Sequence, residues 1–131
     1  MSDHSPVPDS VYRPLRLTYS LVPLLAGLDK FFNLLADWPE YLSPAVASFV
    51  PLEPTTLLHV VGVVEMAVGC MVLTRWPRLG AWIAAAWLCL IAINLLALGS
   101  FDVAVRDLAM AVGAYTLARL AALRDAAGTA P

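Results

Sequence analysis

The stretch that decides the fold is residues 79–120, which read LGAWIAAAWLCLIAINLLALGSFDVAVRDLAMAVGAYTLARL. It holds two apolar runs, Leu79–Leu98 and Phe101–Leu120, each long enough to cross a bilayer core, which takes about 20 residues of helix. Neither run alternates apolar and polar residues, and lipid tolerates only helices or closed barrels, so both runs are predicted to be helices. Only Gly99 and Ser100 separate them. The sequence therefore predicts a tight antiparallel hairpin of two transmembrane helices.

The composition of the whole chain agrees with a membrane location. Of its 131 residues, 60% are hydrophobic and 14% are charged, and the mean hydropathy is +0.76. Soluble domains carry about 25% charged residues. The apolar surplus is too large for the core of one small domain, so much of it is expected to face lipid. The eight basic residues are scattered in ones and twos, so no basic patch points to a nucleic-acid partner.

Two further apolar runs complete the predicted architecture. One spans Leu15–Trp38, and the other begins near Thr55 or Thr56 and ends at Thr74. The predicted fold is all-α, a four-helix transmembrane bundle. The connection at residues 37–55 contains four prolines and a short apolar patch. We expect a short interfacial helix or an ordered loop there, with its Trp and Tyr side chains at the level of the lipid headgroups.

The positions of the basic residues predict the orientation. The connections at residues 37–55 and 99–100 contain no Lys or Arg. All six flanking bases fall on the opposite side, namely Arg13, Arg16, Arg75, Arg78, Arg119 and Arg124. Because basic residues accumulate on the cytoplasmic side, both termini are predicted to be cytoplasmic, in a multi-pass membrane protein. Residues 1–13 are predicted to be a disordered tail, residues 14–122 the four-helix domain, and residues 123–131 a flexible tail.

Polar residues inside the spans form the candidate site. A charged side chain at the centre of a membrane helix costs about 2.5–3.5 kcal/mol on insertion scales, so such residues are expected to face the bundle interior and find partners. Antiparallel threading places nine of them in or near one layer of the outer leaflet: Asp29, Lys30, Asn33, His59, Glu65, Asn94, Asp102, Arg106 and Asp107. The sequence predicts that these residues form a ligand-binding polar cluster, and the alternative is a set of ion pairs that only locks the helices in register.

Helical spacing suggests partners within this cluster. Lys30 shares a face with small residues and is predicted to meet Glu65 or Asp107. Asp29 is turned about 100° from Lys30 and is expected to reach toward Arg106 or an outer-leaflet cavity. Asp102 and Arg106 are four residues apart, a spacing that allows an ion pair within one helix.

Short motifs in three of the spans resemble those of the DoxX family. They are G-x-x-K at Gly27 to Lys30, E-x-x-x-G at Glu65 to Gly69, and Arg106-Asp107-Leu108. The resemblance covers residues 15–122. It implies a small four-helix bacterial membrane protein. Some members are linked to sulfur oxidation as the membrane part of a thiosulfate:quinone oxidoreductase, and others to oxidative-stress defence with soluble redox enzymes.

Three function classes follow from these observations. The first is a membrane subunit of a redox system that holds a quinone headgroup or a small anion; the second is a transporter or channel subunit; the third is a membrane scaffold. Besides the lipid bilayer, a second copy of the chain or a redox partner protein is the expected partner. Cys70 and Cys89 stand apart without a CxxC motif, and the few His and Cys residues suggest no metal site.

Overall fold

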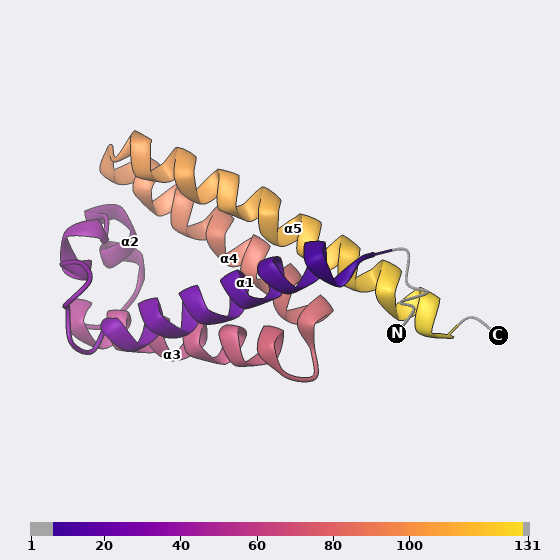
Figure 1. The fold of residues 1–131 in the computed structure, drawn as a ribbon. Coiled ribbons are helices and arrows are strands. Elements are labelled where there is room, and N and C mark those ends of the chain that lie inside the picture. The colour runs from indigo at the N-terminus through magenta and orange to yellow at the C-terminus, as the bar shows by residue number, and fades with distance from the viewer. Residues whose placement is uncertain (1–6, 130–131) are drawn as a thin grey trace.

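The computed structural model describes residues 7–129 and consists of long helices joined by short connections (Figure 1). In chain order the elements are α1 (Asp9–Asp29), the 3-10 helix η1 (Trp38–Tyr41), α2 (Pro44–Phe49), α3 (Pro54–Leu73), α4 (Pro77–Leu98) and α5 (Phe101–Thr129). The predicted all-α fold of four main helices is confirmed, and so is the short helical connection between the first two of them.

The four long helices form two antiparallel pairs (Figure 1). Helix α1 lies along α3, and α4 lies along α5. The predicted tight turn between α4 and α5 is present: Gly99 has a left-handed φ of 88°, which favours glycine. The N–H of Ser100 donates to the carbonyl of Leu95 at 2.9 Å, so the turn satisfies an orphan carbonyl at the helix end. Both termini and the α3–α4 turn lie at one end of the molecule, and α2 and the α4–α5 turn lie at the other.

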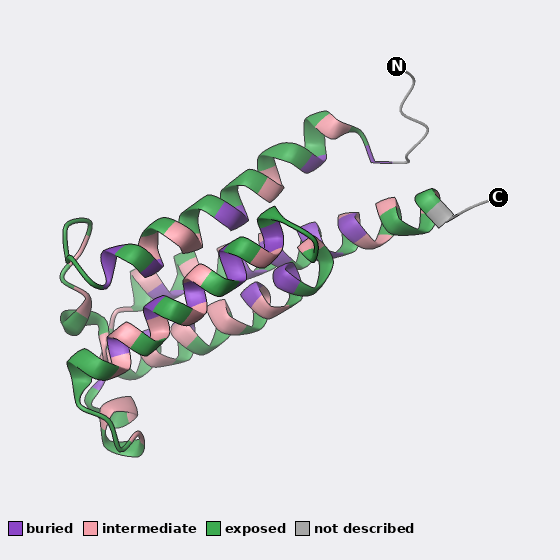
Figure 2. Ribbon diagram, turned by 90° about the horizontal axis from the view of Figure 1, so that it is seen from below, coloured by how far each residue is buried: buried purple, intermediate pink, exposed green. Residues whose placement is uncertain are grey.

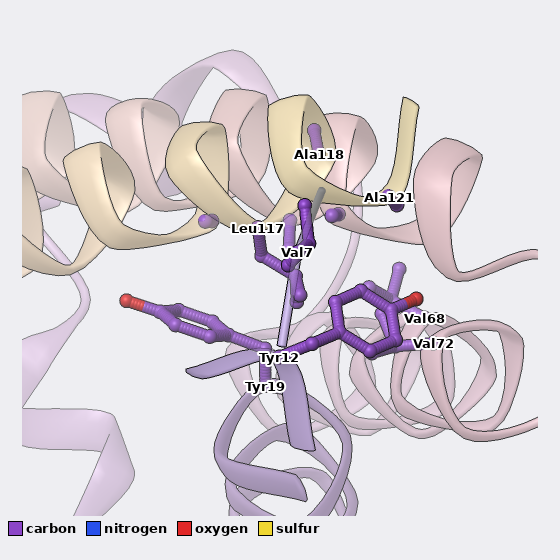
Figure 3. Packing of buried hydrophobic residues seen from close by; sticks show 11 residues of the cluster. Val7, Tyr12, Tyr19, Val68, Val72, Leu117, Ala118 and Ala121 are labelled. Atoms are coloured by element: carbon purple, nitrogen blue, oxygen red, sulfur yellow. The ribbon is translucent and has the colours of Figure 1, made fainter. Parts of the chain in front are cut away.

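The main apolar core lies at the end that carries the termini. Tyr12 and Tyr19 of α1 lie beside Leu117 of α5, and Val68 and Val72 of α3 complete the contact (Figure 3). Val7 and five alanines of α4 and α5 complete the cluster. The small alanine side chains let the backbones of α4 and α5 approach closely, as is usual for helices packed in membranes. This half of the bundle interior is therefore closed and apolar.

Helices α3 and α4 have the length and hydropathy of membrane spans. Only a minority of their residues are buried, and several large apolar side chains are exposed, among them Val60, Val63, Leu90 and Ile93; exposed positions run along both helices (Figure 2). In a soluble protein the apolar surface of such helices would be buried, so this exposure agrees with a surface that faces lipid. Helices α1 and α5 are long enough to span, with 21 and 29 residues, but they are more polar. That each of these two also crosses the membrane stays a prediction.

Helix α1 ends nine residues earlier than the predicted span Leu15–Trp38. After Asp29 the chain turns, and Asn33 adopts a left-handed φ of 54°. The Asp29 carboxylate accepts hydrogen bonds from the backbone N–H groups of Leu34 and Leu35, at 2.9 and 2.8 Å. A side chain that binds the backbone of the following residues offers an alternative to the helical hydrogen bonds, which is the physical reason that the predicted helix end was wrong.

The first and last helices extend into the segments predicted as tails. Helix α1 begins at Asp9, within the tail predicted at residues 1–13, and α5 continues to Thr129, within the tail predicted at residues 123–131. Arg124 joins these two ends, because its guanidinium donates to the Asp9 carboxylate at 2.8 Å. The tail predictions for residues 1–6 and 130–131 lie outside the described residues.

Glycines set the distance between α1 and α3. A Cβ atom built on Gly27 would lie 2.5 Å from the carbonyl oxygen of Gly62, and one built on Gly62 would lie 2.6 Å from the carbonyl oxygen of Gly27. Gly69 makes a similar approach to the backbone of Ser20, two turns further along α3. Real Cβ atoms do not come so close to backbone oxygen, so only glycine permits this helix spacing.

We predict that Gly62→Ala destabilises the bundle by about 1–3 kcal/mol, because the added methyl group must push α1 away from α3. Thermal unfolding in detergent measures the effect. Gly128→Ala is the matched control, since a Cβ at Gly128 meets no atom within 4 Å. Equal melting temperatures for the two variants would show that the close approach does not contribute to stability.

Candidate functional site

The centre of the candidate site is a buried ion pair between α1 and α3. Lys30 Nζ lies 2.7 Å from Glu65 Oε2, and the two side chains are only 6% and 8% exposed. The predicted contact of Lys30 with Glu65 is therefore confirmed. An isolated charge in such surroundings is very costly, so the burial of each of these side chains depends on the contact with the other.

The close approach of α1 and α3 places this pair. Gly62 precedes Glu65 by three residues, so both face α1 from about the same side of α3. A Cβ at Gly62 would lie 3.2 Å from the Cβ of Lys30, so the absence of a side chain leaves room for the lysine stem. Lys30 itself caps α1, and its backbone N–H donates to the carbonyl of Ala26 at 3.2 Å. From that position the side chain reaches across to Glu65.

Two tryptophans flank the ion pair. Lys30 Nζ lies 3.8 Å from the ring centroid of Trp38, a cation–π contact. Trp87 Nε1 is 3.5 Å from Glu65 Oε1, at the outer limit for a hydrogen bond. The sequence indicates for Trp38 only an anchor at the membrane interface, so this contact is not foreseen from it. The sequence does contain one indication of this contact. Asp29 is an acceptor and Trp38 an indole donor, and they lie on the two sides of a turn.

Asp29 positions Trp38. Its carboxylate accepts a hydrogen bond from Trp38 Nε1 at 2.9 Å, in addition to the two from the backbone of the turn. Asp29 is buried, and all of its polar partners lie within nine residues of the chain. The predicted contact of Asp29 with Arg106 is wrong, since within residues 7–129 the carboxylate makes no ion pair with that arginine. Nearby N–H donors satisfy this carboxylate at a lower cost in entropy than a distant arginine would.

Helix α5 contributes Asp107 to the site. This residue is half-buried and lies within electrostatic reach of Glu65 and Lys30. Arg106 and Asp102 are exposed, and the ion pair that their spacing allows does not form within the described part of the chain. An exposed pair of this spacing gains only about 0.3–0.5 kcal/mol, too little to hold two side chains in one geometry.

The remaining polar candidates support the connection between α1 and α3. Asn94 of α4 donates to the carbonyl of Tyr41 at 2.6 Å and accepts from the N–H of Ser43 at 2.9 Å. His59 stacks on Phe31, with ring centroids 4.5 Å apart and an interplanar angle of 13°. The other candidate asparagine, at position 33, is exposed in the turn after α1. None of these three contacts the ion pair directly.

The arrangement combines hydrogen-bond donors, carboxylates and aromatic rings. Lys30 supplies positive charge and donors, Glu65 and Asp107 supply proton-accepting groups, and the indole rings supply flat walls. Trp87 and Asp107 are half-buried, so they are more accessible than the ion pair itself. Groups of these kinds can donate hydrogen bonds to carbonyl oxygens and stack on planar rings.

Comparison with known families gives one match. The DoxX family description matches residues 13–100 of the chain, which is more than half of its length. The match contains the ion pair and both flanking tryptophans, and it ends before Asp107. No curated protein and no solved structure matches the chain.

We predict strong energetic coupling between Lys30 and Glu65. Lys30→Met alone leaves a buried, unpaired carboxylate and should cost about 3–5 kcal/mol, whereas Lys30→Met combined with Glu65→Leu should recover most of that loss. Unfolding of all variants in detergent gives the coupling energy. In the control, Arg13→Met breaks an exposed pair with Asp9, for which about 1 kcal/mol or less is expected. Losses that simply add in the double variant would contradict the coupling.

Proposed function

The chain belongs to the DoxX family of membrane proteins, and from this premise we propose that it is a membrane subunit of a redox system that binds a quinone headgroup. The binding site is the space beside Lys30 and Glu65, bounded by Trp38, Trp87 and Asp107. With both termini on the cytoplasmic side of the bacterial inner membrane, this site opens toward the outer leaflet.

The buried ion pair is the observation that carries the proposal. Intramembrane ionisable residues are expensive and are typically retained for a function. The pair lies between two indole rings, in addition to a second carboxylate from α5. If the ion pair served only to fix the register of α1 and α3, the glycine contacts and the pair itself would be enough. The tryptophans and Asp107 would then have no role. Their convergence on one point supports a ligand site.

Each residue has a distinct role in this proposal. Lys30 donates a hydrogen bond to a carbonyl oxygen of the headgroup, and the Trp38 and Trp87 rings hold the flat ring by its faces. A bound quinone supplies chemistry that takes up two electrons and two protons. Glu65 and Asp107 are the carboxyl groups beside the bound headgroup on this side of the bundle. The electrons come from a redox partner protein, because the chain's own side chains supply none.

The packing of the bundle supports a site that opens to one side only. From Val68 of α3 to the end that carries the termini, the interior is the apolar cluster around Leu117. This cluster leaves no chain of ionisable groups across the membrane, so it favours headgroup binding over proton or solute transport. The site then exchanges ligand with the bilayer or with the outer face.

We predict that a short-chain benzoquinone or naphthoquinone raises the melting temperature of the detergent-solubilised protein. At a hundredfold excess over the Kd, binding should stabilise the fold by about 2.7 kcal/mol. The test variant is Lys30→Met with Glu65→Leu, which removes the donor and leaves no unpaired charge, and it should lose the rise. Arg119→Gln, on the exposed face of α5, is the control and should retain it.

Two outcomes would contradict the proposal. One is the absence of any rise with either quinone class. The other is an equal rise in the double variant, which would mean that the quinone binds elsewhere on the apolar surface. Trp38→Leu tests the contribution of the Trp38 ring to quinone binding by itself. It removes the cation–π contact and leaves the ion pair of Lys30 and Glu65 in place.

A further inference from the structure

A second candidate site lies at the opposite end of the bundle from Lys30. An open groove of about 320 Å³ lies between the α3–α4 turn, the beginning of α4 and the late part of α5. Its polar lining is Arg75, Arg78 and Asp125, and its apolar lining includes Trp76 and Trp82. The α3–α4 turn, which lines the groove, lies at the end that carries both termini (Figure 1).

The two arginines of the groove are available for a ligand. Both are exposed, and within residues 7–129 neither forms an ion pair. They are also not needed to cap α3, because Arg16 of α1 already caps it. The Arg16 guanidinium donates to the carbonyls of Val72, Leu73 and Thr74 at 2.8, 3.0 and 2.6 Å. These bonds fix the position of the end of α3, and therefore the backbone position of Arg75, which follows it.

The apolar wall of the groove is also held in place. Trp82 packs edge-on against Tyr115 of α5, with ring centroids 5.4 Å apart. Trp76 and Leu79 are more than half exposed at the beginning of α4, with relative exposures of 55% and 53%. Helix α4 has the length and hydropathy of a membrane span, so these residues lie where the hydrocarbon of the bilayer meets its headgroups.

We infer that this groove binds the headgroup of an anionic phospholipid, with Arg75 and Arg78 on the phosphate. Guanidinium groups form strong, charge-assisted hydrogen bonds with phosphate oxygens. The exposed tryptophans and Leu79 lie beside the arginines and contact the upper part of the acyl chains, contacts that a free phosphate cannot make. Asp125 forms the far wall and limits the negative charge that the groove accepts. This site is independent of the proposed quinone site.

The test is a titration of the full-length protein in neutral detergent with phosphatidylglycerol or phosphatidylcholine, with bound lipid counted by native mass spectrometry. We expect phosphatidylglycerol to bind more tightly than phosphatidylcholine. Arg75→Gln or Arg78→Gln should weaken phosphatidylglycerol binding about fivefold each, and the double variant about 25-fold. Asp125→Asn should strengthen it, because the rim loses a carboxylate that repels the phosphate.

The control is the double variant Arg13→Gln, Arg119→Gln, which removes the same charge from the same half of the bundle but leaves the groove intact. Its affinity for phosphatidylglycerol should equal that of the unmodified chain. Equal weakening in the two double variants would overturn the inference, because general attraction by basic residues would then explain binding. Equal affinity for the two lipids would also overturn it. So would competition by millimolar inorganic phosphate, which would make free phosphate the ligand.

Discussion

The backbone contact between Gly27 and Gly62 is the constraint on which the functional end of this protein depends. Where two helices meet through glycines, their axes come closer than any pair of side chains would allow. Lys30 and Glu65 each lie three residues beyond one of these glycines, so the same approach brings a lysine and a glutamate into contact inside the bundle. In a low-dielectric interior a separation of a few more ångströms would leave two charges poorly compensated. The glycines thus make the buried ion pair possible.

The polar residues at this end of the bundle divide into two groups. One group forms the candidate site, with Lys30 and Glu65 at its centre. The other group holds the connection between α1 and α3 in place, as Asp29 does through Trp38 and Asn94 does through the backbone of Tyr41 and Ser43. Since a flexible connection could not hold an indole ring against an ammonium group, the second group positions the first.

The two ends of the bundle have different chemistry. At the end that carries the termini, tyrosines, valines and alanines fill the interior, and arginines stand outside it. At the other end the interior carries the ion pair, and the connection between α1 and α3 covers it. The polar groups of the interior therefore lie toward one end of the bundle only. Anionic lipid at the arginine end would fix the height of the bundle in the bilayer, and so the depth of the ion pair.

The sequence by itself determined the helical class, the tight hairpin at Gly99 and Ser100, and the pairing of Lys30 with an acid of another helix, Glu65 or Asp107; the structure selects Glu65. These features depend on the length of the apolar runs, on the high cost of burying an unpaired charge and on the spacing of residues along a helix. All three can be read from the order of residues in the chain. Membership of the DoxX family follows from the sequence as well. The tertiary structure alone decided where α1 ends, that Asp29 binds its own turn, that Trp38 and Trp87 join the ion pair, and that Arg106 does not. Each of these outcomes is a competition between alternative partners, and the winner is set by distances that only the packed helices define.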